Sequence, residues 1–243
     1  IGKAHLLVKE DGILAGVELA ERIFKKVDSR FEMEVFIQDG GRVKKGDIAF
    51  IVTGPSQKLL SAERLILNFM QRLSAIATQT AVYANLLKGT KTKVLDTRKT
   101  TPNLRVLEKM AVVDGGGINH RFSLSDQVMI KDNHIKSAGS ITRAVEIVKS
   151  KIDQSIRIEV EVESFDQFTE ALNTKCDIIM LDNMDNDLMR LCVESNKGKL
   201  LEASGNMVLN RIHGVSETGV DFISVGALTH SYMAMDISLK FNK

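Results

Sequence analysis

The sequence is poor in cysteine and has no long uninterrupted apolar run. Two cysteines are too few for a disulfide framework, and Cys176 and Cys192 lack the close spacing of metal-binding cysteine pairs. We therefore expect both to be buried, unreactive thiols in a reduced, cytoplasmic protein. No apolar stretch approaches the roughly 20 residues that cross a bilayer. Residues 1–8 also lack the apolar core and cleavage pattern of a secretory signal, so we expect no association with a membrane.

Charge is nearly balanced over the whole chain, with 33 Lys and Arg against 31 Asp and Glu. The net charge of +2 argues against nonspecific binding to nucleic acid. Along the chain the balance is uneven. Residues 98–136 carry seven basic and four acidic side chains, whereas residues 152–194 carry three basic and eleven acidic ones. Solvated helix faces explain many of these acids, but the pattern also suits a site with an anion-binding half and a metal-binding half.

The first part of the chain has the pattern of a small α/β region. Strands are predicted at residues 5–9, 31–37 and 48–53 from their apolar patterns. Apolar residues at helical spacing predict a helix at residues 15–27. A long helix should follow, with Ser61 as its N-cap and Leu87 near its end. Its expected apolar stripe consists of Leu65, Phe69, Leu73 and Ile76. Arg64 falls on a different, polar face, a position that is usually solvated.

Short apolar runs then alternate with helical patterns, and the last four recur about every 22 residues. This is the rhythm of βα units in a parallel barrel. Six strands are predicted, at residues 94–95, 128–130, 156–162, 178–181, 200–203 and 222–225. A seventh or eighth strand is not visible, so closure of the barrel is an inference. We expect an N-terminal domain over residues 1–75, a barrel over residues 76–231, and a last strand within residues 232–243 that returns to the first domain.

Basic side chains form three clusters, each at or just past a short apolar run: Arg98 and Lys99, His120 and Arg121, and Lys131 and His134. Residues at the carboxyl ends of barrel strands meet at one edge of the barrel, so the clusters should converge. Each arginine could hold a carboxylate or phosphate through two parallel hydrogen bonds. The pattern predicts a strongly negative substrate, although any one of these cations could belong to a structural ion pair. Arg105 and Lys109, at helical spacing after Pro102, should lie at the surface or behind the site.

Two acidic residues end consecutive strands of the predicted barrel. Glu161 and Asp182 could together hold one Mg²⁺ that bridges substrate phosphates, or could instead be held by backbone amides. Glu159 points to the same side as Glu161 because it lies two residues earlier on one strand, and it is a weaker candidate ligand. Small residues end the last two strands, at 204–205 and 226–229. They would let backbone N–H groups approach a phosphate, although a plain tight turn explains them equally well.

The longest of these motifs are Leu95-Asp-Thr-Arg-Lys-Thr-Thr-Pro102, Gly115-Gly-Gly-Ile-Asn-His-Arg121 and Ile130-Lys-Asp-Asn-His134. With segments 68–78, 159–161, 181–183, 202–205 and 224–231, they resemble the quinolinate phosphoribosyltransferase family (nicotinate-nucleotide pyrophosphorylase, carboxylating) in order and nearly in spacing. The resemblance covers almost the whole chain. It differs in one respect, because family members carry further N-terminal residues, including a Gly-Asp-x-Thr-like segment, and this sequence begins after them.

The resemblance implies an α/β fold: an incomplete TIM-like α/β barrel with a small N-terminal open-faced α/β sandwich domain. It also implies a homodimer in which Arg64 reaches the neighbouring subunit's site. The expected activity is phosphoribosyl transfer from phosphoribosyl pyrophosphate (PRPP) to quinolinate with decarboxylation, a step of NAD biosynthesis. Mg²⁺ is the expected cofactor, bound by Glu161 and Asp182, which would also contact the ribose hydroxyls of PRPP. Lys99, Lys131, Glu161 and Asp182 would act in catalysis.

Further roles follow from the same resemblance. The carboxylates of quinolinate would be held by Thr97, Arg98, His120, Arg121 and Lys131, with Arg64 from the partner. Lys99 and His230 would serve the pyrophosphate, and the 5′-phosphate of PRPP would rest on Ser204, Gly205 and Gly226. Three alternatives remain open: a phosphoribosyltransferase for nicotinate or another ring acid, a Schiff-base aldolase that uses Lys131, and an anion-binding protein that is not an enzyme.

Overall fold

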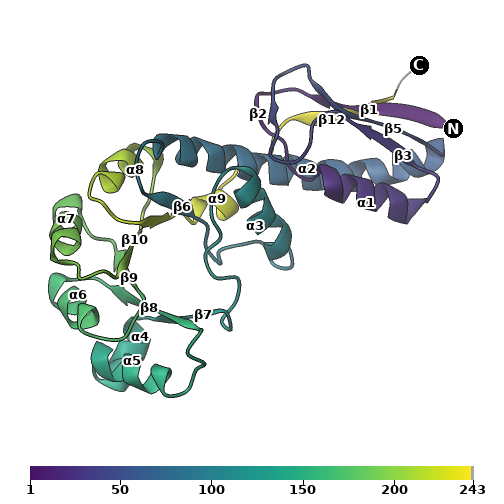
Figure 1. Ribbon diagram of the computed structural model, residues 1–243. Coiled ribbons are helices and arrows are strands. Elements are labelled where there is room, and N and C mark those ends of the chain that lie inside the picture. Colours follow the sequence, from purple (N-terminus) through teal and green to yellow (C-terminus); the bar gives the residue numbers. More distant parts are fainter. Residues whose placement is uncertain (242–243) are drawn as a thin grey trace. The chain divides into compact units, whose positions relative to one another are not determined.

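The computed structural model describes residues 1–241, and the chain forms two compact units (Figure 1). Unit 1 contains residues 1–82, residues 100–117 and the residues from Ala227 onward. Unit 2 contains residues 83–99 and residues 118–226. Of the segment 232–243 that we expected to return to the first domain, positions 242 and 243 lie outside the described residues.

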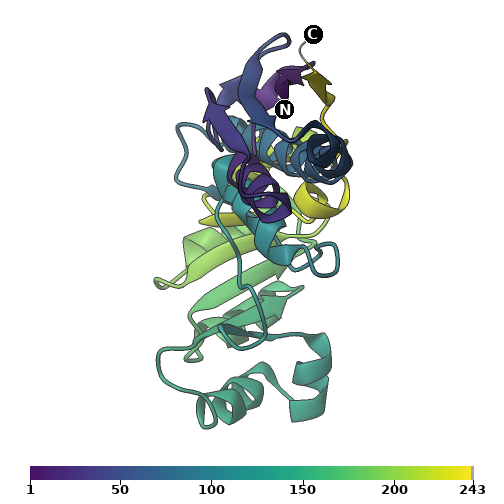
Figure 2. The same cartoon turned by 90° about the vertical axis from the view of Figure 1, so that its right-hand side faces the viewer.

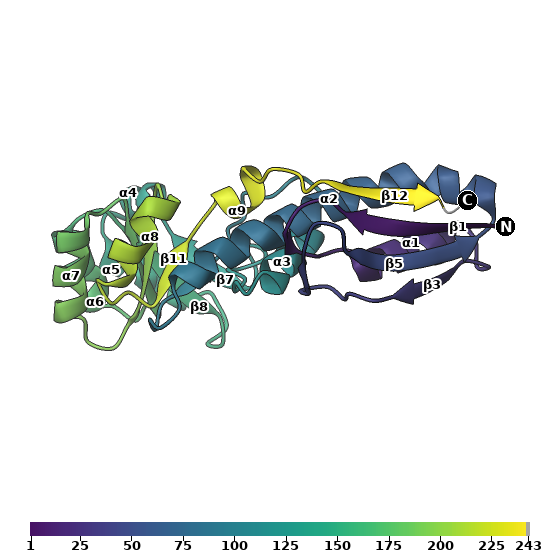
Figure 3. The ribbon, with the colours of Figure 1, turned by 90° about the horizontal axis from the view of Figure 1, so that it is seen from above.

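Unit 1 is built on a four-stranded antiparallel sheet in the order β12-β1-β5-β3. The strands are β12 (Ile237–Phe241), β1 (Gly2–Val8), β5 (Ile48–Gly54) and β3 (Glu32–Val35). Figures 2 and 3 show the yellow β12 beside the purple β1, with which it pairs antiparallel. Along β1, buried side chains alternate with partly exposed ones, which is typical of a sheet that is covered on one face.

Helices α1 (Val17–Val27) and α2 (Ser56–Leu86) cover that face. Phe24 of α1 packs against Phe31 and Phe50, with ring centroids 5.0 and 6.4 Å apart. The unit is therefore an open-faced α/β sandwich. It also contains the two-residue strands β2 (Gly12–Ile13) and β4 (Arg42–Val43), which pair with each other, and the helices α3 (Arg105–Asp114) and α9 (Ala227–His230).

The predicted start of the long helix was wrong by five residues. Helix α2 begins at Ser56, directly after Pro55, whose carbonyl accepts the N–H of Leu59 at 2.9 Å. Proline is favoured where a helix starts because its fixed φ suits the first turn. Ser61 lies inside the helix, and its hydroxyl donates to the carbonyl of Gln57 at 2.9 Å. The buried stripe is shifted as well, since Leu65 is 49% exposed and the core side is formed by Leu59, Ala62, Ile66, Met70, Leu73 and Ile76.

Unit 2 contains a six-stranded parallel sheet in the order β6-β11-β10-β9-β8-β7. All six predicted strands are confirmed, as β6 (Lys93–Leu95), β7 (Gln127–Ile130), β8 (Arg157–Val162), β9 (Ile178–Asp182), β10 (Leu200–Ser204) and β11 (Phe222–Ser224). The helices of the unit are α4 (Asp132–Ala138), α5 (Ile141–Lys149), α6 (Phe165–Leu172), α7 (Asn186–Ser195) and α8 (Leu209–Ser216). The sheet curves with helices on its outer face, and β6 and β7 are its edges (Figure 1). It is an incomplete TIM-like barrel.

Both cysteines are buried, as predicted: Cys176 is 2% exposed and Cys192 is fully buried. Burial raises the pKa of both thiols, which disfavours the reactive thiolate. Within residues 1–241, every helix is too short or too polar to span a bilayer.

Candidate active site

The inner face of the parallel sheet carries charged residues that the strand register aligns. On β8, Ile158, Val160 and Val162 are fully buried on the helix side, so Glu159 and Glu161 point to the opposite face. Glu161 pairs with Met180 on β9, which pairs with Glu202 on β10. Residues paired in neighbouring strands share a face. Glu161 of β8, Glu202 of β10 and Asp182, two residues after Met180 on β9, therefore lie on one face of the sheet.

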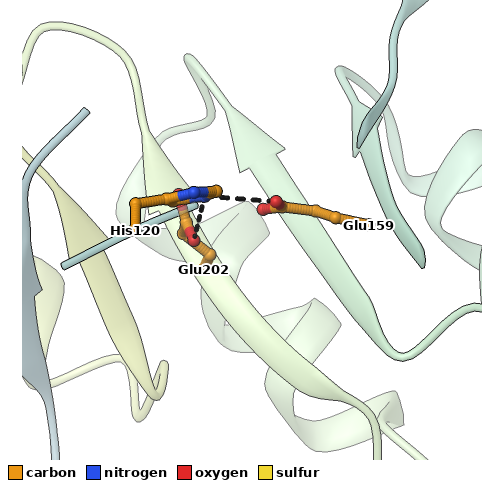
Figure 4. Close-up of side chains that lie close together, drawn as sticks. All are labelled: His120, Glu159 and Glu202. Atoms are coloured by element: carbon orange, nitrogen blue, oxygen red, sulfur yellow. Dashed lines mark ion pairs between the residues drawn. The ribbon is translucent and has the colours of Figure 1, made fainter. Parts of the chain in front are cut away.

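Two of these acids enclose a histidine (Figure 4). Nε2 of His120 lies 3.1 Å from Oε2 of Glu159 and 3.3 Å from Oε2 of Glu202. Both carboxylates are almost completely buried, with exposures of 0% and 1%. Glu159 was only a weak sequence candidate, and sequence reasoning gave Glu202 no role. The sequence did contain a signal, the alternation of side chains along a strand. An acid inside an apolar strand points either into the barrel or toward the helices.

Other side chains hold this cluster in place. The amide of Gln127 donates to Oε2 of Glu159 at 2.6 Å, and the hydroxyl of Ser224 donates to Oε1 of Glu202 at 2.5 Å. Asp96 is fully buried, and its Oδ1 accepts the backbone N–H of His120 at 2.8 Å. The cluster is therefore fixed from β6, β7, β8, β10 and β11.

The carboxylates also set the protonation of the cluster. Burial alone lowers the pKa of His120, but hydrogen bonding with Glu159 and Glu202 outweighs burial and raises it. Burial and the charge of Glu202 raise the pKa of Glu159 to about 7, against the opposing effect of His120. In the neutral ring, Nδ1 of His120 accepts the backbone N–H of Arg121 at 2.7 Å, and the one ring proton lies on Nε2, toward the carboxylates. A second proton on the ring, which the raised pKa favours, would have to displace that N–H from Nδ1.

Arg121 is half-buried next to this cluster. Its Nη1 donates to the carbonyl of Gln127 at 3.1 Å, and its Nη2 lies 3.6 Å from Sδ of Met129. Burial lowers the pKa of Arg121, and the neighbouring charge of Arg98 lowers it further. The charge of Arg98 therefore acts on Arg121, as the predicted convergence requires. Two guanidinium groups that repel each other favour a bound anion.

Lys131 and Glu161 form an ion pair that the sequence did not predict. Lys131 follows β7 and precedes α4, whereas Glu161 lies near the end of the adjacent strand β8. Asp182, at the end of β9, accepts a hydrogen bond from the side-chain amide of Asn183 at 2.8 Å. An ammonium group in an ion pair is a poor nucleophile, which disfavours the Schiff-base alternative for Lys131.

The turn after β10 has a constrained backbone. Gly205 has a φ of 90°, and a Cβ there would lie 2.3 Å from Oδ1 of Asn183. Asn206, the next residue, also has a positive φ, of 49°. Arg211 of α8 donates to the carbonyl of Gly205 at 3.0 Å and to that of Met184. The carbonyls of this turn point toward Arg211, and Gly205 has no room for a side chain. Both features suit a loop whose backbone N–H groups approach a phosphate.

The remaining predicted residues are placed as follows. Thr97 and Lys99 follow β6, and the hydroxyl of Thr97 accepts the backbone N–H of Lys99 at 3.1 Å. Gly226 follows β11 in unit 2. Arg64 is exposed on α2 and His230 is exposed at the end of α9, where its Nδ1 lies 2.6 Å from Oγ of Ser231; both belong to unit 1.

Of the two places expected for Lys109, at the surface or behind the site, the structure excludes the surface, because this residue is only 3% exposed. Helix α3 turns the face with Glu108 and Lys109 into the interior of unit 1, where Glu108 pairs with Arg72 of α2 at 2.8 Å. Arg105, which we expected beside it, is partly buried, and its Nε donates to the hydroxyl of Thr100 at 3.0 Å.

Two groups of residues offer metal ligands. One ligand atom from each of His120, Glu159 and Glu202 lies within 4.8 Å of the other two. Glu161 and Asp182 form the second group, on neighbouring strands and on one face of the sheet. The second group supplies oxygen donors alone, which Mg²⁺ prefers, whereas a buried set containing a nitrogen donor suits a transition metal better.

Two family models match consecutive parts of the chain. The model described as "Quinolinate phosphoribosyl transferase, N-terminal domain" matches residues 1–74, and the corresponding C-terminal domain model matches residues 76–240. The chain belongs to the quinolinate phosphoribosyltransferase family. Its membership agrees with the order of motifs seen in the sequence.

Individual family members are similar to this chain over nearly the whole of its 243 residues. A quinolinate phosphoribosyltransferase [decarboxylating] of Nicotiana tabacum is 44% identical over 98% of this chain and 73% of its own. A probable nicotinate-nucleotide pyrophosphorylase [carboxylating] of Synechocystis is 41% identical, over 98% and 82%. The solved nicotinate-nucleotide pyrophosphorylase of Francisella tularensis superposes with a TM-score of 0.96 at 41% identity, covering 99% of this chain and 86% of that one. Sequence and fold therefore agree on the family.

Proposed function

We propose that this protein transfers the phosphoribosyl group of PRPP to quinolinate and releases CO₂, giving nicotinate mononucleotide and pyrophosphate for NAD biosynthesis. The observation that supports the proposal is that Arg98 and Arg121 are two half-buried arginines of unit 2 whose charges repel each other. Their mutual repulsion is relieved by an anionic ligand, and quinolinate is a dicarboxylate. Both relatives described above have names that state this reaction or its reverse.

The quinolinate carboxylates are assigned to the basic side chains around Arg121. Arg98 and Arg121 supply the forked hydrogen bonds, and Lys131 adds a point charge once it exchanges Glu161 for substrate. Thr97 completes this set. His120, whose ring nitrogens contact the Arg121 backbone and the two glutamates, is assigned to holding Arg121 instead of contacting a carboxylate. A nicotinate-specific enzyme would need fewer cations, because nicotinate carries a single carboxylate.

Mg²⁺ and PRPP are assigned to the acidic side of the site. Glu161 and Asp182 fit Mg²⁺ because their carboxylates lie on one face of adjacent strands. When bound, Mg²⁺ would neutralise charge on the pyrophosphate leaving group. The backbone at Ser204, Gly205 and Gly226 is assigned to the 5′-phosphate. Lys99 and His230 are assigned to the pyrophosphate.

The reaction then needs positioning and charge stabilisation more than covalent chemistry. Alignment of the two substrates supplies most of the acceleration. The bond from ribose C1 to pyrophosphate breaks, and the quinolinate nitrogen attacks the oxocarbenium-like carbon. Lys99 stabilises the charge that develops on the leaving group. The positive ring nitrogen then stabilises the electron pair left on C2 when CO₂ departs, and C2 takes up a proton.

A homodimer is part of the proposal, with Arg64 donated to the partner's site. The exposure of Arg64 on α2 supports it. Two inactive variants, Arg64→Ala and Arg121→Ala, would be unfolded together and refolded as mixed dimers. Recovery of about a quarter of the wild-type activity is expected, because half of the dimers would contain one intact site. No recovery would contradict donation of Arg64.

We propose a cytoplasmic location and include no nucleic acid or membrane partner. The tobacco relative is named as mitochondrial, so the compartment is tested separately by cell fractionation. Recovery of the protein in an organelle or membrane fraction would contradict this part of the proposal.

The deciding experiment is release of ¹⁴CO₂ from carboxyl-labelled quinolinate with Mg²⁺, in the presence and absence of PRPP. Release that requires PRPP is expected, with nicotinate mononucleotide as the product. Conversion of nicotinate without CO₂ release would favour the related phosphoribosyltransferase. Trapping of Lys131 by borohydride with a carbonyl substrate would favour the aldolase instead.

A further inference from the structure

Arg121 lies in a segment whose backbone is held mainly by side chains. Residues 118–126 connect α3 to β7, and Ile118 forms a parallel bridge with Leu95 of β6, at the opposite edge of the sheet. Beyond Ile118, four consecutive backbone N–H groups donate to side-chain acceptors. The N–H of His120 donates to Asp96 at 2.8 Å, and that of Arg121 donates to Nδ1 of His120 at 2.7 Å. The N–H groups of residues 122 and 123 both donate to Asp126, at 2.6 and 2.7 Å. The orientation of these side chains therefore sets the local backbone.

A closed circuit of contacts runs through Arg121. Its backbone N–H donates to Nδ1 of His120, and Nε2 of the same ring lies 3.1 Å from Glu159. The amide of Gln127 donates to that same oxygen of Glu159 at 2.6 Å. The backbone carbonyl of Gln127 accepts a hydrogen bond from Nη1 of Arg121 at 3.1 Å. The circuit thus fixes both the backbone and the guanidinium of Arg121.

Glu202 clamps the imidazole from a second strand. It approaches Nε2 at 3.3 Å from β10, while Glu159 approaches from β8, and both ion pairs meet at Nε2 of the ring (Figure 4). Ser224 holds the other oxygen of Glu202 at 2.5 Å. With Nδ1 bonded to the backbone and Nε2 between carboxylates, the ring is held at both nitrogens.

We infer that Glu159 and Glu202 are positioning residues for Arg121: by clamping His120, they hold the Arg121 guanidinium in the orientation that binds a ring carboxylate. The inference rests on the proposed function and deepens it. Neither glutamate touches the substrate in this role. A buried hydrogen-bonded network of this kind restricts a side chain to one geometry, which a carboxylate clamp requires.

The test uses Glu159→Gln and Glu202→Gln, each alone and combined with Arg121→Ala. These substitutions keep the shape of the side chain but weaken its hold on the imidazole. We expect KM for quinolinate to rise about tenfold or more, with KM for PRPP changed less than about twofold. In the Arg121→Ala background the same substitutions should add little, because they act through Arg121. Glu146→Gln on the exposed face of α5 is the matched control, and its kinetics should equal wild type.

Several results would overturn the inference. Unchanged kinetics in both variants would do so, and so would equal rises in KM for both substrates or full additivity with Arg121→Ala. A transition metal retained by the wild type at one per chain and lost in Glu202→Gln would show that the cluster binds a metal instead. If Glu159→Gln does not fold, Gln127→Met loosens the same carboxylate and must give the same quinolinate-specific rise. Wild-type ¹⁴CO₂ release tests the proposed function separately, since it can succeed while the inference fails.

Discussion

Nη1 of Arg72 lies 2.8 Å from Oε1 of Glu108, a carboxylate with no exposed surface, and joins helices α2 and α3 of unit 1. The same nitrogen donates to the hydroxyl of Thr101 at 2.6 Å, and the backbone N–H of Thr101 donates to Oε2 of Glu108 at 3.1 Å. Tyr232 lies on the guanidinium, 4.9 Å from ring centroid to Cζ. Glu108 therefore anchors the end of the Leu95–Pro102 motif to the helices.

Glu108→Ala should destabilise the protein by about 3 kcal/mol, because removal of one partner leaves a largely buried charge without its counterion. Thermal unfolding should move down by about 6–12 °C. Met110→Ala removes a half-exposed side chain from the same helix and should change the melting temperature far less. Equal losses in the two variants would show that the ion pair contributes nothing specific.

Arg121→Ala should lower kcat/KM for quinolinate by at least two orders of magnitude, about 3 kcal/mol, through loss of a forked contact to carboxylate. Arg157→Ala is the matched control, since this exposed arginine begins β8, away from the strand's carboxyl end. Steady-state kinetics of both variants provide the comparison. A near-normal value for Arg121→Ala would remove this residue from the carboxylate clamp.

Gly205→Ala should raise KM for PRPP about tenfold or more, because its Cβ would meet Asn183 at 2.3 Å and shift the backbone of the turn. Gly198→Ala is the matched control. Gly198 has a similar φ of 94°, but a Cβ there would have no heavy atom within 4 Å. Both variants bear the cost of a positive φ, so a rise in KM confined to Gly205→Ala isolates the effect of the turn. Equal KM values would argue against a phosphate site there.

Asp114→Asn should stabilise unit 1 at neutral pH. Burial and the nearby charge of Asp39 raise the pKa of Asp114 from 3.8 to about 6, and the residue ends α3, where the helix dipole disfavours a negative charge. Between these two pH values the folded state holds a proton that the unfolded chain has released. This group's contribution to the free energy of unfolding therefore falls as pH rises from about 4 to 6.

The variant should flatten that part of the stability profile and gain about 1 kcal/mol at pH 7.5, after allowance for partial exposure. Melting temperatures measured from pH 4 to pH 8 provide the test. Glu21→Gln, an exposed change on α1, should leave the profile parallel to wild type. A parallel profile for Asp114→Asn would refute the assignment.

The strands of the barrel were predictable because strands buried on both faces appear as apolar runs. Segment 178–181 is an example, and it became β9 with one added residue. The start of α2 was missed because Ser61 looks like an N-cap in sequence, whereas Pro55 sets the first turn. Strands β2 and β4 were missed because two residues carry no periodic signal.

The site was predictable to a similar extent. Arg98 and Arg121 could be chosen as candidates because each lies at or just past a short apolar run, and the charge of Arg98 acts on Arg121. The pair Lys131–Glu161 did not, because it depends on the register of β7 against β8. Glu202 was hidden inside an apolar run, and its inward direction becomes visible only when β10 is aligned with β9.

The pairing of β12 with β1 has a consequence for synthesis of the chain. Val8 pairs with Ile237, so this edge of β1 stays open until residue 237 has left the ribosome. Pairing over such a separation is slow, and an open edge can recruit another chain in the meantime. Chains cut shortly before β12 would therefore expose β1 and be prone to aggregation. Strand β12 therefore completes the sheet of unit 1 only after the whole of unit 2 has been synthesised.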